Sequence, residues 1–280
     1  MEVKVKTRFR ALGVLAIFAV YSPPLSAQWP SYPMAGAPRT PDGKVKLDAP
    51  APRTADGKPD LSGVWEAVRT GTGQAIVGPD VPPLSRTSQF WNVGAGRAEG
   101  DLPLRPWASA LRDKRIADHS KDNPDAHCLP IGITQLHNHP QPRKIIQTRS
   151  VIIILYEANG GIRQILLDGR PLPGNDPQPW WYGYSIGKWD GDTLVVETTR
   201  FRDDGWLDVN GAPLTEAAKM TERIRRVDYG NMEIEVSVDD PKAYTKRWTA
   251  VKMRHRLLPD EELIEFVCGE NEKSSQHFEK

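Results

Sequence analysis

The chain has 280 residues and a formal net charge of +1, which suits one well-buried domain and gives no excess of either charge. The first 27 residues carry four cations and Glu2, so the rest has a net charge of −2 and lacks the basic footprint of nucleic-acid-binding or lipid-surface proteins. No phosphate-binding loop, dinucleotide fingerprint or nucleophile elbow is present. The sequence therefore predicts no cofactor and no nucleic-acid partner.

Residues 1–27 have the three parts of a secretory signal peptide. A basic start is followed by an apolar run from Ala11 to Tyr21, and Ala27 places a small residue at the expected cleavage site. The 11-residue run is too short for a membrane-spanning helix, which needs about 20 residues. No later segment is long and apolar enough to span. We therefore predict a periplasmic or secreted protein without a transmembrane segment after cleavage.

Residues 28–59 are predicted to form a proline-rich linker. The sequence Ala-Pro-Arg-Thr-Pro-Asp-Gly-Lys at Ala37–Lys44 is nearly repeated at Ala51–Lys58. Proline and Asp-Gly favour turns, and the stretch has few apolar side chains to bury. Such a linker either holds the following domain at a distance or wraps its surface. We expect it to lack regular structure and to be cut by protease before the domain.

The domain predicted over residues 60–280 is composed mainly of strands. The segment 232–238 alternates apolar and polar residues, which is the period of a half-buried strand. One short helix is expected from Pro106 to about His119, after a long loop over 72–105. Strands are expected at Lys144–Tyr156, Ile162–Leu167, Ser185–Trp189, Thr193–Phe201, Thr221–Val227, Met232–Val238, Tyr244–Leu258 and Leu263–Cys268.

Short Asn-Gly and Asp-Gly turns between these strands favour an all-β fold in which neighbours along the chain pair as an antiparallel meander. A meander avoids exposed edges by closing on itself, so we predict a lipocalin-like barrel or a strongly curved sheet with one short helix. A barrel of this size encloses either packed side chains or one small ligand.

Cys128 and Cys268 are the only cysteines in the sequence. In an oxidising compartment an even pair favours a disulfide, and closing a loop of this length stabilises a fold by about 4–5 kcal/mol on the chain-entropy model. The bond would join the start of the main sheet region to its last strand. The alternatives are a shared metal site and buried free thiols.

His127, His137 and His139 lie close together in a proline-rich loop. Two histidines separated by one residue share a side of an extended segment, and a third would complete a zinc site. Neither Cys-x-x-Cys nor His-Glu-x-x-His accompanies them, so no metal is predicted. The alternative is a solvent-exposed loop whose imidazoles bind nothing. We retain His137 as a candidate ligand-binding residue and His139 as a candidate catalytic residue.

An aromatic cluster formed by Trp180, Trp181, Tyr182 and Tyr184 is the densest in the chain. At the mouth of a barrel such rings offer flat apolar surface to a ligand. The alternative is a core strand followed by a packed turn.

An acidic-aromatic loop contains Asp203, Trp206 and Asp208, and the next strand carries Glu222 and Arg223 on opposite faces. An inward carboxylate beside aromatic rings has its pKa raised by burial, which suits a general acid or base. Glu222 and Asp208 are therefore candidate catalytic residues, and Asp203, Trp206 and Arg223 are candidate ligand-binding residues. The alternative for Glu222 is an ion pair with an arginine.

Several motifs are similar to those of a widespread family of secreted, mostly uncharacterised bacterial proteins. They cover the chain from about Asp60 onward, and the resemblance implies a signal peptide and a β-rich domain but no reaction. At Gly211–Leu214 the chain departs from the histidines that such proteins often carry. Gly63-Val64-Trp65 also resembles the Gly-x-Trp opening of lipocalin-like barrels. The family motifs are Cys128–Pro130, Ile154–Asn159, Asp168–Pro171, Ser185–Val196, Thr221–Arg223, Asp239–Thr245 and Cys268–Asn271.

Three functions remain open from the sequence. The first is an extracytoplasmic barrel that binds a small apolar or aromatic ligand. The second is a cofactor-independent lyase, isomerase or hydrolase that uses carboxylate and histidine acid–base chemistry on a small substrate. The third is a structural domain of the cell envelope. For the first two we expect one shared site, at the end of the barrel where 180–184, 203–208, the histidine loop and Glu222 meet.

Overall fold

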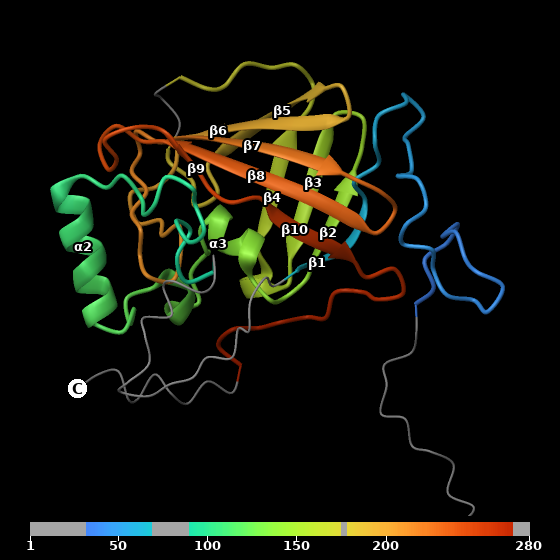
Figure 1. The fold of residues 1–280 in the computed structure, drawn as a ribbon, viewed down its shortest axis with the longest axis horizontal. Helices are drawn as coiled ribbons and strands as arrows, with labels where there is room; N and C mark the ends of the chain where they lie inside the picture. The colour runs from blue at the N-terminus through green and yellow to red at the C-terminus, as the bar shows by residue number, and fades with distance from the viewer. Residues whose placement is uncertain (1–31, 69–89, 175–177, 271–280) are drawn as a thin grey trace, which may run out of the picture. The chain divides into compact units, whose positions relative to one another are not determined.

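Nine strands close into a barrel in the computed structural model, which describes residues 32–68, 90–174 and 178–270 (Figure 1). The predicted signal peptide and the start of the linker lie outside these residues. The strands are β1 (Gly63–Ala67), β2 (Arg143–Gln147), β3 (Val151–Tyr156), β4 (Ile162–Leu166), β5 (Tyr184–Asp190), β6 (Thr193–Thr199), β7 (Lys219–Arg226), β8 (Asn231–Asp239), the two-residue β9 (Trp248–Thr249) and β10 (Met253–Leu257).

The barrel closes because β8 pairs with both β7 and β10, while β10 also pairs with β1. β9 extends the sheet from β8 outside the closed ring. All neighbours in the ring are antiparallel except β4 and β5, which pair in parallel through Ile165–Ser185 and Leu166–Ile186. A ring with an odd number of strands requires at least one parallel pair. The predicted all-β barrel is confirmed, but its sheet is mixed rather than a pure meander.

Four secondary-structure predictions were wrong in detail. The strand expected at Tyr244–Leu258 is two separate strands, β9 and β10. The apolar run Lys144–Tyr156 is two strands, because Thr148 bonds the backbone of Val151 and forms a turn between them. Leu263–Cys268 forms no strand, since the chain leaves the sheet after β10 and the segment has no strand beside it. A second short helix, α3 (Ile133–Asn138), accompanies the predicted helix α2 (Pro106–Ala117). Single 3-10 turns occupy Pro124–His127 and Ala158–Gly160.

The two ends of the barrel differ in their connections. At one, here called the turn end, short turns join β2 to β3, β5 to β6 and β7 to β8. At the other, the loop end, lie the segment that carries α3 and the long connection from β6 to β7. The connection between β4 and β5 runs from the turn end back to the loop end, which is why these two strands pair in parallel.

The barrel interior is mainly apolar, with buried polar side chains among the apolar ones. Toward the turn end, the inward positions of β6, β7 and β8 carry Leu194, Ile224 and Ile234, all at most 2% exposed. Toward the loop end, the equally buried Thr198 and Glu222 lie among apolar side chains such as Val236. The alternation of buried and exposed residues along β7 turns Glu222 inward and Arg223 outward, as the sequence predicts.

Residues 33–59, here called the strap, run along the turn end of the barrel rather than standing away from it (Figure 1, blue). The strap contains no helix or strand, but its backbone is tied down: Ala49 and Leu47 accept hydrogen bonds from the amides of Tyr229 and Gly230 at 2.7 Å. A Cβ on Gly230 would approach Leu47 to 2.5 Å, so glycine is needed for this close contact. The faster proteolysis of the strap stays a prediction.

The predicted disulfide between Cys128 and Cys268 is confirmed, with a Cα–Cα distance of 5.5 Å. Its second cysteine lies in the irregular segment after β10, not in a strand. The bond therefore fixes this segment to the turn that precedes α3. Within the described ranges, no helix has the length and apolar character needed to cross a membrane.

Candidate functional site

The loop end of the barrel is blocked by α3, whose residues Ile133 to His137 are all buried. The hydroxyl of Thr134 donates a hydrogen bond of 2.5 Å to the carbonyl of Leu207 in the β6–β7 connection. Gly132, which precedes the helix, packs directly against the backbone of Trp206. The β6–β7 connection, which contains the predicted site loop 203–208, therefore holds α3 in position. The helix in turn presents His137 to the barrel interior.

We expect Gly132→Ala to loosen this arrangement. The added Cβ would lie 2.0 Å from the carbonyl oxygen of Trp206, so either α3 or the loop must move. Overpacking of this kind lowers the free energy of unfolding by about 1–3 kcal/mol. Chemical denaturation measures the loss, and Gly174→Ala, where an added Cβ meets nothing within 4 Å, is the matched control. Equal stability of the two variants would contradict the tight contact.

A buried ionic cluster lies beneath α3. His137 Nε2 donates a hydrogen bond of 2.7 Å to Glu222 Oε1, and Arg163 binds both carboxylate oxygens of Glu222 through its two terminal nitrogens. Arg163 also donates to the hydroxyls of Ser185, at 3.0 Å, and Thr198, at 3.2 Å. All five side chains are at most 2% exposed. The sequence offered an ion pair with an arginine as the alternative role of Glu222. That ion pair is present, and the arginine is Arg163 on β4.

The cluster continues on the far side of His137. Arg143 Nη1 donates to His137 Nδ1 at 3.4 Å, and His255 Nε2 donates to the backbone carbonyl of His137 at 2.8 Å. Arg143 thus binds the Nδ1 atom of His137 and Glu222 binds its Nε2 atom, so both ring nitrogens are engaged. Among the described residues, the Tyr156 hydroxyl, Arg143 Nε and His255 Nδ1 are buried without a hydrogen-bond partner.

The electrostatics of the cluster fix its protonation. Burial raises the pKa of Glu222, but the charge of Arg163 and the hydrogen bonds from His137 and Arg163 outweigh it and bring the pKa to about 2. Burial lowers the pKa of His137 more than Glu222 raises it, and burial lowers that of His255 still further. Glu222 is therefore ionised and both imidazoles are neutral at pH 7. The Glu222 carboxylate accepts three hydrogen bonds and is fully buried, so a reacting group does not reach it without a movement of the surrounding side chains.

The other two candidate catalytic residues lie apart from this cluster. Asp208 accepts hydrogen bonds from the amides of Val93 and Ala212 at 2.8 and 3.0 Å, and burial raises its pKa to about 6. These contacts fix the loop that contains it. His139 packs edge-on against Phe90, with ring centroids 5.5 Å apart. The structure therefore brings Glu222 and His137 together but places Asp208 and His139 in other surroundings.

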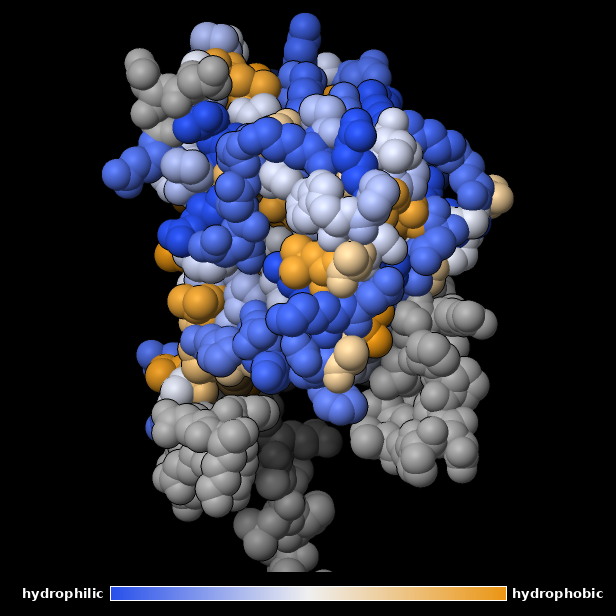
Figure 2. Space-filling model, turned by 90° about the vertical axis from the view of Figure 1, so that its left-hand side faces the viewer, coloured by the Kyte–Doolittle hydropathy of each residue, from blue (hydrophilic) through white to orange (hydrophobic). Residues whose placement is uncertain are grey.

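The candidate ligand-binding residues also separate into groups. Trp180 stacks near Tyr184 at a centroid distance of 5.4 Å and pairs through its backbone with Phe201. Trp181 lies under the guanidinium of Arg202, Tyr182 packs on Tyr156, and Trp206 packs under Arg115. Arg223 points outward and pairs with Asp190 at the turn end, away from the others. Figure 2 shows the side of the molecule that includes α2, which is largely hydrophilic with scattered hydrophobic groups.

Asp203 lines a cleft of about 700 Å³ beside α2. Its carboxylate accepts a hydrogen bond of 2.6 Å from the amide of Glu216, and a hydrogen bond shared with the Glu216 side chain raises the pKa of Asp203. Trp107 borders the same cleft, and its indole N–H donates to the carbonyl of Lys242 at 2.8 Å. Asp203 is exposed and Glu216 is partly exposed, so this cleft is a polar hollow at the surface.

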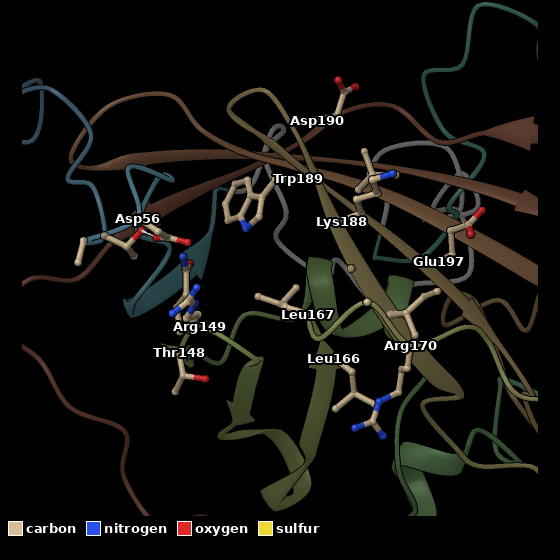
Figure 3. Close-up of a pocket in the computed structure, with 17 residues that line it drawn as sticks. Asp56, Thr148, Arg149, Leu166, Leu167, Arg170, Lys188, Trp189, Asp190 and Glu197 are labelled. Carbon is tan, nitrogen blue, oxygen red and sulfur yellow. Dashed lines mark hydrogen bonds between the residues drawn. The ribbon is translucent and has the colours of Figure 1, made fainter.

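A larger cleft of about 1230 Å³ lies at the turn end, where β4 stops at Leu166 and β5 continues to Asp190 (Figure 3). Its apolar surface comes from Leu166, Leu167, Ile186, Trp189 and Val195. A Cβ on Gly187 would lie 2.7 Å from the Leu167 side chain, so the glycine allows this leucine to lie across the parallel pair. The same cleft is bordered by Thr54, Ala55 and Asp56 of the strap.

The charged groups around this turn-end cleft are unequally paired. Asp190 binds Arg223, Glu197 binds Lys219 and Arg170 binds Asp168. Among the described residues, Arg149 and Lys188 have no ion-pair partner within 4 Å. In Figure 3 Arg149 lies beside Asp56 on the strap side of Trp189, whereas Lys188 lies on the other side of β5. The cleft thus combines an apolar floor with two cations at its margin.

Sequence reasoning missed this cleft. Trp189 stands directly before the Asp190-Gly191-Asp192 turn, and the repeated Ala-Pro-Arg-Thr segments stand in the strap, so both signals were visible. What was not visible is that the strap crosses the barrel beside that turn. Groups of three or more metal-binding side chains in metal-binding geometry are absent from the described ranges.

Comparison with protein-family models, with curated proteins and with solved structures finds no match to this chain. Only the geometry of the two ends of the barrel therefore bears on its function.

Proposed function

We propose that this protein binds a small molecule with an apolar or aromatic body in the turn-end cleft, and that it does so outside the cytoplasm. The observation that carries the proposal is the half-buried indole of Trp189, which packs with Leu167 against the barrel core and lines a cleft large enough for such a molecule. Binding sites of this kind are mainly apolar with a few polar groups at their margin, as here with Arg149 and Lys188.

The buried cluster supports binding rather than catalysis. Acid–base catalysis requires a group that can exchange a proton with a substrate in reach. Glu222 is held ionised by Arg163, and His137, which α3 itself carries, is buried and has both ring nitrogens engaged. These contacts are those of a polar core that fixes the barrel and its helix. The extracytoplasmic location is supported by the Cys128–Cys268 bond, because disulfides persist mainly in oxidising compartments.

We expect Trp189→Ala to weaken the binding of N-phenyl-1-naphthylamine, a neutral aromatic probe, by about five- to thirtyfold. An aromatic side chain on the floor of a site contributes on the order of 1–2 kcal/mol through burial and stacking, and about 1.4 kcal/mol is a factor of ten. Titration followed by the fluorescence of the bound probe gives the Kd. Trp189→Phe, which keeps an aromatic ring, should retain most of the affinity.

Trp180→Ala is the matched control, because Trp180 is 41% exposed and belongs to the aromatic segment at the loop end. Its probe affinity should equal that of the unmodified protein, and circular dichroism checks that each variant is folded. If Trp180→Ala abolishes binding and Trp189→Ala does not, the site is at the loop end. If the unmodified protein binds no apolar probe, the proposed function is wrong.

A further inference from the structure

The two repeats in the strap fold into the same unit, here called a clasp. In the first, the Thr40 amide donates to the carbonyl of Lys44, and Arg39 donates to that of Gly43, both at 2.8 Å. In the second, Thr54 and Arg53 make the same two bonds, with Lys58 and Gly57, at the same distances. In both, the threonine hydroxyl also binds the aspartate two residues later. The repeated sequence is therefore a repeated structure.

Each clasp presents one arginine to one aspartate of the barrel. Arg39 binds both carboxylate oxygens of Asp260, which follows β10, at 2.5 and 3.1 Å. Arg53 binds both oxygens of Asp192, in the β5–β6 turn, at 2.7 and 2.9 Å. Because each guanidinium is already fixed by a carbonyl of its own clasp, it is pre-organised for this two-point contact.

The two clasps differ in what lies beside them. The second clasp contributes Thr54, Ala55 and Asp56 to the wall of the turn-end cleft, and the first contributes no residue to it. The second is also the more exposed: its arginine and aspartate side chains are 51% and 55% exposed, against 30% and 32% in the first. Exposed ion pairs are weak and are screened by salt, so the second clasp is the more easily released.

We propose that the second clasp sets how tightly the turn-end cleft holds its ligand, because the Arg53–Asp192 pair docks one wall of the cleft. The inference rests on the proposed function of that cleft. The first clasp and the backbone bonds at Leu47 and Ala49 hold the strap on the barrel, so release of the second clasp moves the wall without detaching the strap. Arg53 thereby acts as a positioning residue, and the strap is an element of the site.

The test compares Arg53→Gln with Arg39→Gln, which removes the same contact from the clasp outside the cleft. With N-phenyl-1-naphthylamine as the probe, we expect Arg53→Gln to weaken binding by about two- to fivefold, the range given by one exposed ion pair, and Arg39→Gln to leave it unchanged. The loss should be in the dissociation rate, measured by stopped-flow dilution. The exchanged pair Arg53→Asp with Asp192→Arg should recover part of the affinity.

The dependence of probe affinity on salt concentration separates this positioning role from a merely structural one. Because the probe is neutral, screening acts on the clasp and not on the probe, so the ratio of the two variants' affinities should approach one at about 1 M salt. Equal affinity of Arg53→Gln and Arg39→Gln at low salt would overturn the inference while leaving the function of the cleft intact. Loss of all probe binding in the unmodified protein would instead reject the proposed function itself.

Discussion

Glu222→Gln should lower the free energy of unfolding by about 3–5 kcal/mol at pH 7. The change removes the carboxylate charge but leaves Arg163 buried, and a buried charge that loses its partner is destabilising by about that amount. Arg163 is 2% exposed and Glu222 is fully buried, so water cannot replace the missing contact. Urea denaturation followed by tryptophan fluorescence measures the loss.

The pH dependence of this loss has a definite sign. The folded-state pKa of Glu222 is about 2, below its ordinary value of 4.5, so its stabilisation is complete above pH 4.5 and disappears as the pH falls toward 2. The difference between the unmodified protein and Glu222→Gln should therefore shrink between pH 5 and pH 2. A combined Glu222→Met and Arg163→Met variant should lose less stability than the two single changes together, because no unpaired charge remains. Unchanged stability in Glu222→Gln would contradict the buried pair.

Replacing both Cys128 and Cys268 with serine should destabilise the protein by about 4–5 kcal/mol on the chain-entropy model, because the bond joins residues 140 apart. For a domain of this size that corresponds to a fall in Tm of about 10–15 °C. Differential scanning calorimetry of the oxidised protein, the reduced protein and the double variant measures the effect. The reduced protein and the variant should agree. A fall of less than about 2 °C would show that the bond restrains only the segment after β10.

Much of the barrel was predictable because its signals are local. The Asp190-Gly191-Asp192 turn and the alternation along β8 identify strands and turns from a few neighbouring residues. The same period places Glu222 inward without knowledge of any partner. Because the sequence has two cysteines, their pairing could be predicted, although a shared metal site and free thiols stayed open as alternatives.

The parts that could not be predicted depend on contacts distant in sequence. The meander predicts that the histidine loop and Glu222 share one end of the barrel, but the direct bond between His137 and Glu222, 85 positions apart, has no local signal in the sequence. The six-residue α3 is too short to show a helical period, and its place in the barrel depends on a loop more than 70 residues away. The parallel pairing of β4 and β5 depends on the path of their long connection. The turn-end cleft depends on the docking of the strap, which sequence periodicity does not report.

The ring closure has a consequence for the order of folding. β1 is near the amino terminus, yet its neighbours are β2, nearly 80 residues later, and β10, near the other end of the chain. Contacts between such distant segments form slowly, because closing a long loop costs conformational entropy before the strand pairing can offset it. During synthesis or export, the hairpins β2–β3, β5–β6 and β7–β8 can each form as soon as they emerge. β1 must remain an unpaired edge until its partners arrive, so this strand is the one that most needs protection from aggregation.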